Sequence, residues 1–451
     1  MSLRARVEAA VRRAARSRTS ADLVAISVPL TFDAASTAAR EDAAFVWDAR
    51  RAEALSADVC VAFGEAAAVE GIGDGRIAQA RAAATQLWEH VELTAGADPR
   101  MFGAISFDTS LGPFEQFAQA RFALPRVTLR GGSRSEIGLV LSREELAHPA
   151  AIAEEVEALS QAPARGVHRP RGRVLRDGRT MFERAVERAL LSIEAGELSK
   201  VVLARAVSID SDATSSGVLA ELEEAAGAVR YCIRRGSAAF LGATPELLIK
   251  VQDGEVRTEA VAGTEPRRGQ ELAEAARLLS RPKDLEEHRW VVEAITAGLE
   301  RAGVTAAHEA ARVRTLPFVH HLVTPIVARR PEGAHVLDLV SALHPTPALG
   351  GSPRDQALAF IRDAEPVPRG LYAGPVGWVD ARGNGEMVVA LRGALMEPSG
   401  ALAYAGAGIV RGSVVELEAQ ETDAKLLSMF RALGVTAASK VERPHLREAG
   451  A

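Results

Sequence analysis

The second half of the chain repeats a pattern of strand-like segments separated by tight turns. Asp253-Gly254 is the strongest short indication of a β-hairpin, because both residues readily adopt a positive φ. Consecutive hairpins pair antiparallel, and segments with helical periodicity, 271–303 and 415–433, lie among them. We therefore predict a large, mainly antiparallel sheet with helices outside it, rather than a doubly wound parallel sheet. The segments with strand character are 200–209, 238–251, 255–262, 370–380, 386–396 and 401–410.

The first part of the chain carries weaker patterns. Residues 163–172 are rich in proline, glycine and arginine, which is typical of a linker or a long surface crossing. We predict an N-terminal α/β part over residues 1–165, a catalytic part over 166–435 and a tail over 436–451, all within one structural domain. In the N-terminal part, strands are expected at 22–30, 57–63, 101–107 and 137–141, and helices at 75–93 and 149–160.

Charge and composition exclude some classes of function. Across 451 residues, 54 lysine and arginine residues stand against 59 aspartate and glutamate residues, a net charge of −5. That balance opposes nucleic acid or an anionic membrane as the main partner, since both require a strongly basic face. No uninterrupted apolar run is long enough to span a bilayer. Two cysteines, Cys60 and Cys232, cannot build a disulfide framework, so we expect a cytoplasmic enzyme.

Two of the predicted helices each carry a pair of carboxylates three residues apart. The pairs are Asp284 with Glu287 and Glu418 with Glu421. Residues at this spacing lie on one helix face, so two facing pairs could bind a hard divalent cation such as Mg²⁺. The alternative is commonplace, since acidic pairs are frequent on solvated helix faces. Lys425, four residues after Glu421, is equally compatible with an ordinary ion pair along the helix.

Lys200 and Glu246 stand out because they are ionisable residues within apolar strands. Lysine occurs at only five positions, and every other basic residue is arginine, which does not release its proton near neutral pH. Lys200 could serve as a general base if desolvation favoured its neutral form, although a lysine at a strand end usually extends to solvent. Glu246 could serve as a general acid if burial kept it protonated, with a plain exposed strand residue as the alternative.

A series of short motifs between residues 170 and 435 occurs in the order found in the chorismate-utilising enzymes, and the chain resembles that family. The N-terminal part resembles it only loosely, through residues 102–108 and 122–125. Coincidence does not explain so many motifs in one order. The motifs are KVVLAR at 200–205, ATPE at 243–246, AGT at 262–264, KDLEEH at 283–288, LHPTPA at 343–348, YAG at 372–374, ALR at 390–392 and GAG at 406–408.

The resemblance implies a fold, a cofactor and catalytic roles. The fold would be α+β, with two large, mainly antiparallel sheets packed together and flanked by helices. Lys200 would activate water for attack at ring carbon C2 of chorismate, and Glu246 would protonate the departing C4 hydroxyl. Mg²⁺ would hold the C1 carboxylate of the substrate. The metal ligands would be Glu287 and Glu421, supported by Asp284 and Glu418.

The same resemblance assigns residues to the rest of the substrate. Positive charge and close approach of the backbone at glycine would hold the two carboxylates of chorismate. Contacts to the carboxylates are expected from Tyr372, Arg392, Gly406 and Lys425, and the ring pocket is expected to be lined by Gly263, Thr264 and His344.

Departures from family patterns select among the activities of the family. Members that use ammonia usually carry glutamine where this chain has Lys200, so the lysine favours water, isochorismate synthase activity and no obligatory glutaminase subunit. The near alternatives are a siderophore-pathway isochorismate synthase and a salicylate synthase, which goes on to eliminate pyruvate. An inactive binding subunit is the alternative from another class, and the intact acid, base and metal positions oppose it. We expect a monomer or homodimer that interconverts chorismate and isochorismate, in menaquinone biosynthesis.

Overall fold

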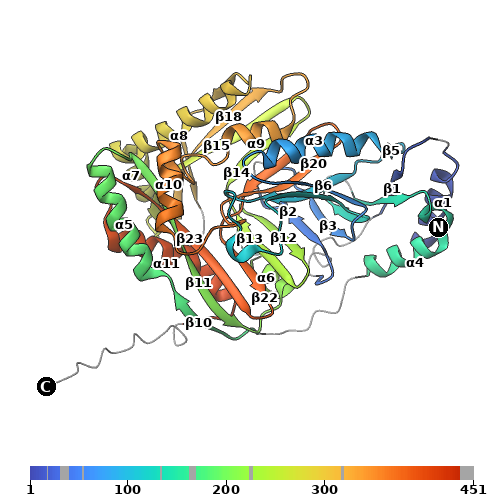
Figure 1. Ribbon diagram of the computed structural model, residues 1–451, viewed down its shortest axis with the longest axis horizontal. Helices are drawn as coiled ribbons and strands as arrows, with labels where there is room; N and C mark the ends of the chain where they lie inside the picture. The colour runs from blue at the N-terminus through green and yellow to red at the C-terminus, as the bar shows by residue number, and fades with distance from the viewer. Residues whose placement is uncertain are drawn as a thin grey trace.

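Two large sheets that share one apolar core dominate the computed structural model (Figure 1). We call the sheet that contains residue 200 sheet A and the other one sheet B. The structure describes residues 1–17, 19–30, 40–52, 55–132, 135–161, 169–222, 227–315 and 319–436, except for the side chains of residues 264, 266, 283 and 319. Residues 437–451 of the expected tail therefore lie outside the described residues.

The spatial order of the strands mixes early and late parts of the chain. Sheet A runs β10 (Gly172–Asp177), β11 (Lys200–Ser211), β23 (Gly400–Val410), β22 (Gly393–Glu397), β13 (Ala238–Thr244), β12 (Val229–Arg235), β2 (Phe45–Asp48), β3 (Val59–Phe63), β8 (Val127–Gly131), β9 (Glu136–Ser142), β1 (Leu23–Pro29) and β5 (Val91–Leu93), with β19 (Gly351–Ser352) also paired to β11. Sheet B runs β16 (Ala306–His308), β18 (Val319–Arg329), β15 (Glu255–Pro266), β14 (Leu247–Gln252), β21 (Gly385–Val389), β20 (Pro375–Asp380), β6 (Arg100–Ile105), β7 (Ala120–Leu124) and β4 (Ala67–Gly71), with β17 (Arg312–Thr315) also paired to β18.

Nearly all of these strands pair antiparallel. Within the described ranges the pairing of β1 with β5 is the exception, so the predicted α+β class with two mainly antiparallel sheets is confirmed. Strands from residues 1–165 and strands from residues 166–435 occur in both sheets, and the two parts share one core.

Helices cover the outer faces of the sheets (Figure 1). Helices α5 (Arg179–Glu194), α6 (Ser215–Glu221) and α11 (Val415–Ala432) contact strands of sheet A, and α3 (Arg76–Glu89), α7 (Glu271–Ser280), α8 (Pro282–Arg301) and α9 (Val336–Leu343) contact strands of sheet B. Helices α1 (Leu3–Ala14) and α4 (Pro149–Ser160) pack on each other, and α10 (Arg354–Ala364) packs against β11. No helix of the described residues is long and apolar enough to cross a membrane.

Two predicted strands are each divided between the sheets. The segment 238–251 forms β13 in sheet A and β14 in sheet B, with the break at Pro245 and Glu246. The segment 386–396 forms β21 in sheet B and β22 in sheet A, with the break ending at Arg392, whose φ is 49°. Because β13 pairs with β22 and β14 pairs with β21, the two crossings run side by side. A continuous apolar run does not reveal that it changes sheets, so both predictions of a single strand were wrong.

Other expectations hold or fail for local reasons. The hairpin at Asp253 and Gly254 is confirmed, since β14 pairs with β15 and both turn residues have a positive φ. The helix expected over 271–303 is broken into α7 and α8, because the residue before Pro282 is extended rather than helical. The helix expected over 75–93 ends at Glu89, and β5 follows.

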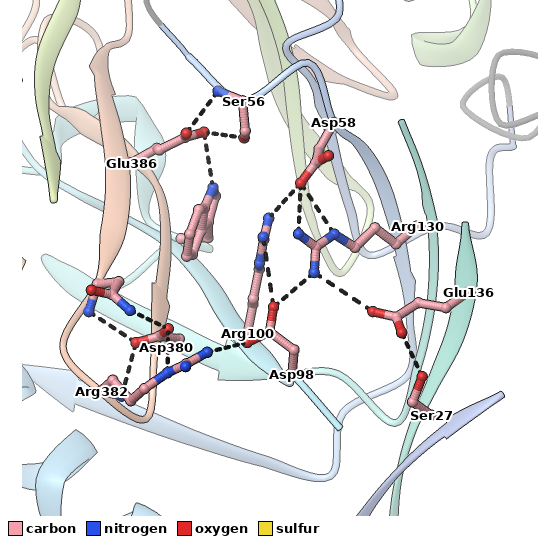
Figure 2. Close-up of polar contacts among 12 residues, drawn as sticks. Ser27, Ser56, Asp58, Asp98, Arg100, Arg130, Glu136, Asp380, Arg382 and Glu386 are labelled. Carbon is pink, nitrogen blue, oxygen red and sulfur yellow. Dashed lines mark hydrogen bonds and ion pairs between the residues drawn. The ribbon is translucent and has the colours of Figure 1, made fainter. Parts of the chain in front are cut away.

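A network of buried charges also joins the two sheets (Figure 2). Asp58 is fully buried, and its Oδ2 lies 2.8 Å from Nη2 of Arg130 on β8 and 3.3 Å from Nη1 of Arg100 on β6. Arg130 also donates to Asp98 at 2.8 Å, and the guanidinium of Arg100 lies 3.7 Å from the ring centre of Trp378. Since Arg130 belongs to sheet A and Arg100 to sheet B, Asp58 holds the sheets in a fixed relation through opposite charges.

Candidate active site

One cavity of about 690 Å³ lies where sheet A, sheet B, α8 and α11 meet. It brings together residues that are far apart in the sequence, and it contains most of the side chains that the motifs indicated. The predicted residues that line it are Lys200, Glu246, Gly263, Asp284, Glu287, Tyr372, Arg392, Gly406, Glu418, Glu421 and Lys425. The side chain of Thr264 lies outside the described part of the structure.

Lys200 is the first residue of β11 and points into the cavity. It pairs with Val410 of β23 on one side and with Ser352 of β19 on the other, so its backbone is held on both edges. Its side chain is buried, and Nζ lies 2.5 Å from Oε1 of Glu287. A Cβ on Gly408 would lie 3.2 Å from Cε of Lys200, so glycine leaves the room that the lysine uses. The amine is therefore confined beside a carboxylate, instead of extending to solvent.

Glu246 occupies the point where the chain crosses from β13 to β14. Its carbonyl accepts from the amide of Val389 at 3.0 Å, which fixes the crossing against β21. Burial raises the pKa of its carboxyl to about 7, although Lys425, Arg392 and Lys200 oppose the shift. A carboxyl with this pKa is substantially protonated at neutral pH, so it can donate a proton.

The second crossing places Arg392 in the same cavity. The phenol of Tyr231, which is fully buried, donates to the carbonyl of Leu391 at 3.2 Å and so supports the backbone just before Arg392. Tyr372 lines the cavity and stacks on Tyr404 with ring centres 5.0 Å apart. Burial raises the pKa of Tyr372 to about 12, so its hydroxyl remains a donor at neutral pH.

Helix α11 contributes both an acidic and a basic group. Nζ of Lys425 lies 2.6 Å from Oε1 of Glu421 and donates to the carbonyl of Gly406 at 2.8 Å. Burial opposes ionisation of Glu421, but Lys425 outweighs it, so the pKa of Glu421 is lowered. Lys425 thus forms the ion pair along the helix and also lines the cavity, so the structural and the substrate-binding interpretation of Lys425 do not exclude each other.

The carboxylates suit Mg²⁺ by their chemistry, but they do not form the compact cage that four facing side chains suggest. Glu287 contacts Lys200, and Oδ2 of Asp284 lies 3.2 Å from Nη1 of Arg281. Among the described residues, no three His, Cys, Asp or Glu side chains lie close enough to hold a metal ion. Mg²⁺ commonly takes one or two protein carboxylates and completes its shell with water and an anionic substrate, so this donor set remains compatible with it.

One expected pocket residue lies outside the cavity. His344 is only 2% exposed, its ring packs edge-on against Phe107, and Nε2 lies 3.2 Å from the carbonyl oxygen of Phe107. The ring therefore packs in the protein interior and does not line this cavity, so its expected contact with the substrate ring stays a prediction. Ala348 and Leu349, from the same motif region, do line the cavity.

Several cavity residues were not singled out from the sequence. His321 is the third residue of β18; it lines the cavity, and burial lowers its pKa to about 3, so the ring is neutral. Its neighbour His320 contacts Glu274 instead, as alternation along a strand requires. The sequence alone predicts that the two histidines point to opposite faces of the strand, but it does not tell which face borders a cavity. The arginines that also line the cavity are Arg268, Arg281, Arg314 and Arg369.

Comparisons with known proteins identify the family of the chain. A family model described as chorismate binding enzyme matches residues 9–434. The salicylate biosynthesis isochorismate synthase of Pseudomonas aeruginosa is 36% identical over 395 residues, which cover 82% of each chain. The isochorismate synthase MenF of Bacillus subtilis is 38% identical over 262 residues, 56% of this chain and 55% of that one. The solved structure of MenF, the menaquinone-specific isochorismate synthase of Escherichia coli, has a TM-score of 0.79 and 29% identity over 96% of this chain and 100% of that chain.

Proposed function

Because the chain belongs to the family of chorismate-binding enzymes, we propose that it is an isochorismate synthase, which interconverts chorismate and isochorismate. The observation that carries this proposal is the placement of Lys200 and Glu246 in one cavity. One is an amine confined beside a carboxylate, and the other is a carboxyl with a pKa of about 7. The reaction needs one group to accept a proton and one to donate it, and these two side chains supply both.

In the forward direction, Lys200 accepts a proton from the water that attacks C2 of the ring. The new C2–O bond forms as the ring double bonds shift and the C4–O bond breaks. Glu246 gives its proton to the departing hydroxyl, which leaves as water. Lys200 has then gained one proton and Glu246 has lost one, and the reverse reaction restores both.

The remaining cavity residues bind and orient the substrate in this proposal. Arg392, Lys425 and Tyr372 donate to the two carboxylates of chorismate, and Gly406 allows the substrate to approach the backbone. Mg²⁺ would be bound by Glu287 and Glu421, with Asp284 and Glu418 in support. It would neutralise the C1 carboxylate and so stabilise the negative charge that develops on the ring during attack at C2.

A product assay tests the proposal. Purified protein is incubated with chorismate and Mg²⁺, with and without EDTA, and the products are separated by chromatography. An equilibrium mixture with isochorismate, lost in EDTA and in Lys200→Ala, is the expected result. Salicylate and pyruvate as main products would assign the chain to the lyase activity instead. Product formed only with added ammonium would contradict water as the nucleophile.

We infer further that the isochorismate supplies menaquinone biosynthesis. The likeness to the menaquinone-specific enzyme extends over almost the whole chain, which supports this choice. The likeness to the salicylate biosynthesis isochorismate synthase of Pseudomonas aeruginosa favours the alternative that the isochorismate is converted to salicylate. Expression in a strain that lacks its menaquinone isochorismate synthase should restore menaquinone, measured by mass spectrometry of extracted quinones. If the enzyme is expressed and active but does not restore menaquinone, the pathway assignment is contradicted, whereas the proposed reaction is not.

A further inference from the structure

The strand that carries Lys200 has an incomplete edge. On one side, β11 pairs with β23 from Lys200 to residue 209. On the other side, β19 covers residues 200 and 201, and β10 covers residues 207–211. Within the described residues, the stretch from 202 to 206 has no strand beside it on that edge. Buried amides and carbonyls need partners, so something else has to satisfy them.

An ion pair between two side chains fills this gap. Nη2 of Arg369 donates to the carbonyl of Val202 at 2.6 Å, and Oε1 of Glu365 accepts from the amide of Ala204 at 2.8 Å. The two side chains are joined by a 2.5 Å contact between Nη2 of Arg369 and Oε1 of Glu365. The pair thus supplies a donor and an acceptor to alternate residues of β11, as a neighbouring strand would.

The position of the pair is closely restrained. Arg369 is 3% exposed, its guanidinium lies 4.3 Å from the ring centre of Phe107, and Nη1 donates to the carbonyl of Leu349 at 2.8 Å. Each guanidinium nitrogen therefore donates to a protein acceptor, including Nε, which donates to Glu365. Although Arg369 borders the cavity, its hydrogen bonds are used by the protein, so it is suited to hold structure rather than substrate.

We propose that Arg369, together with Glu365, is a positioning residue that fixes the position and orientation of the Lys200 side chain in the cavity. This inference rests on the proposed role of Lys200 as base. The pair clamps β11 two and four residues beyond Lys200, where the strand lacks a neighbour. A small displacement of a catalytic group from its reactive position lowers the rate steeply, because the proton transfer depends on alignment. The substrate-binding groups Arg392 and Lys425 lie on other elements. Tyr372 donates its amide to the main-chain carbonyl of Arg369 at 2.9 Å, a contact that a change of the Arg369 side chain does not remove.

Two variants test the proposal, with a matched control. Arg369→Lys keeps the charge but cannot reach Glu365, Val202 and Leu349 together, because an ammonium lacks the planar fork. The double variant Arg369→Met with Glu365→Gln removes the charges together and avoids leaving one of them buried alone. Arg230→Lys is the control. Arg230 is also a buried arginine that pairs with a carboxylate, Asp48, and donates to a backbone carbonyl, that of Leu219, but it does not line the cavity.

Steady-state kinetics on folded protein, at a temperature well below each variant's Tm, separate positioning from general stability. We expect kcat to fall at least tenfold in Arg369→Lys and further in the double variant, with KM for chorismate changed less than threefold. Arg230→Lys should lower Tm comparably and keep the wild-type kcat. A wild-type kcat in either Arg369 variant, or an equal loss in Arg230→Lys, would overturn the proposal. If the wild-type protein makes no isochorismate, the proposed function itself fails, which is a distinguishable result.

Discussion

Replacing Glu246 by glutamine should abolish turnover and at the same time stabilise the fold at alkaline pH. The carboxyl, which lines the cavity, has a pKa of about 7 in the folded chain, against 4.5 for an unperturbed glutamate side chain. In the unfolded chain it therefore ionises more easily than in the native one. Its contribution to stability is full below pH 4.5 and is lost as pH rises through 7. Glutamine keeps the shape of the side chain but has no charge to bury, so the variant escapes this loss.

The size of the effect follows from the shift in pKa. With those two pKa values, the easier ionisation of Glu246 in the unfolded chain lowers the free energy of unfolding by up to about 3 kcal/mol at pH 8, about 2 kcal/mol at pH 6 and less than about 1 kcal/mol at pH 5. These are upper values, because the carboxyl borders a cavity that water can enter. The Glu246→Gln variant should therefore exceed the wild type in free energy of unfolding at pH 8, and the difference should vanish toward pH 4.5.

Urea denaturation of both proteins between pH 4.5 and pH 8 measures this difference. Glu293→Gln, on the exposed face of α8, removes the same charge and serves as a control that should show no comparable pH dependence. Loss of activity in Glu246→Gln, on the order of 10² to 10⁴, should accompany the gain in stability, since the amide cannot donate the proton. A variant no more stable than the wild type at pH 8, or equally stabilised at pH 4.5, would refute the assignment of Glu246 as a carboxyl kept neutral by burial.

Three further changes have defined outcomes. Glu421→Ala should raise the Mg²⁺ concentration for half-maximal activity by about tenfold or more, and an unchanged Mg²⁺ titration would remove Glu421 from the ligand set. Gly408→Ala should lower kcat by on the order of tenfold, because the new Cβ would lie 3.2 Å from Cε of Lys200. A normal kcat would show that the Lys200 side chain can shift without loss of activity. Asp58→Ala should cost about 3–5 kcal/mol of unfolding free energy, since two buried arginines lose a counter-charge, and a small loss in denaturation would contradict the role of the network.

The parts of the fold that depend on local chemistry were accessible from the sequence. The hairpin at Asp253-Gly254 follows from the positive φ that such turns require. The break before Pro282 could have been predicted from the proline, but the expected helix over 271–303 ran across it. The two crossings between sheets were not accessible, because an apolar strand reads the same whichever sheet it joins. Pro245 was a hint, since proline cannot continue a central ladder.

The candidate site divides in a similar way. The spacing on the helices predicted that Glu287 and Glu421 face one site, and both side chains line the cavity. The i,i+4 spacing also allowed the ion pair that Lys425 forms with Glu421. It could not tell that Lys200, from β11, would contact Glu287. Motif membership also does not specify direction, as His344 shows, since a motif residue can be required for packing as well as for the pocket. The roles of the individual site residues remain predictions for the experiments above.

The strand order also has a consequence for synthesis on the ribosome. The central partner of β11 is β23, which is made roughly two hundred residues later. At about 5–20 residues per second, that edge of β11 waits for about 10 to 40 seconds before its partner exists. An apolar strand with an open edge is prone to pair with other chains during such an interval. Because α11 follows β23, a chain that ends before residue 400 lacks both the strand beside Lys200 and the helix that carries Glu421.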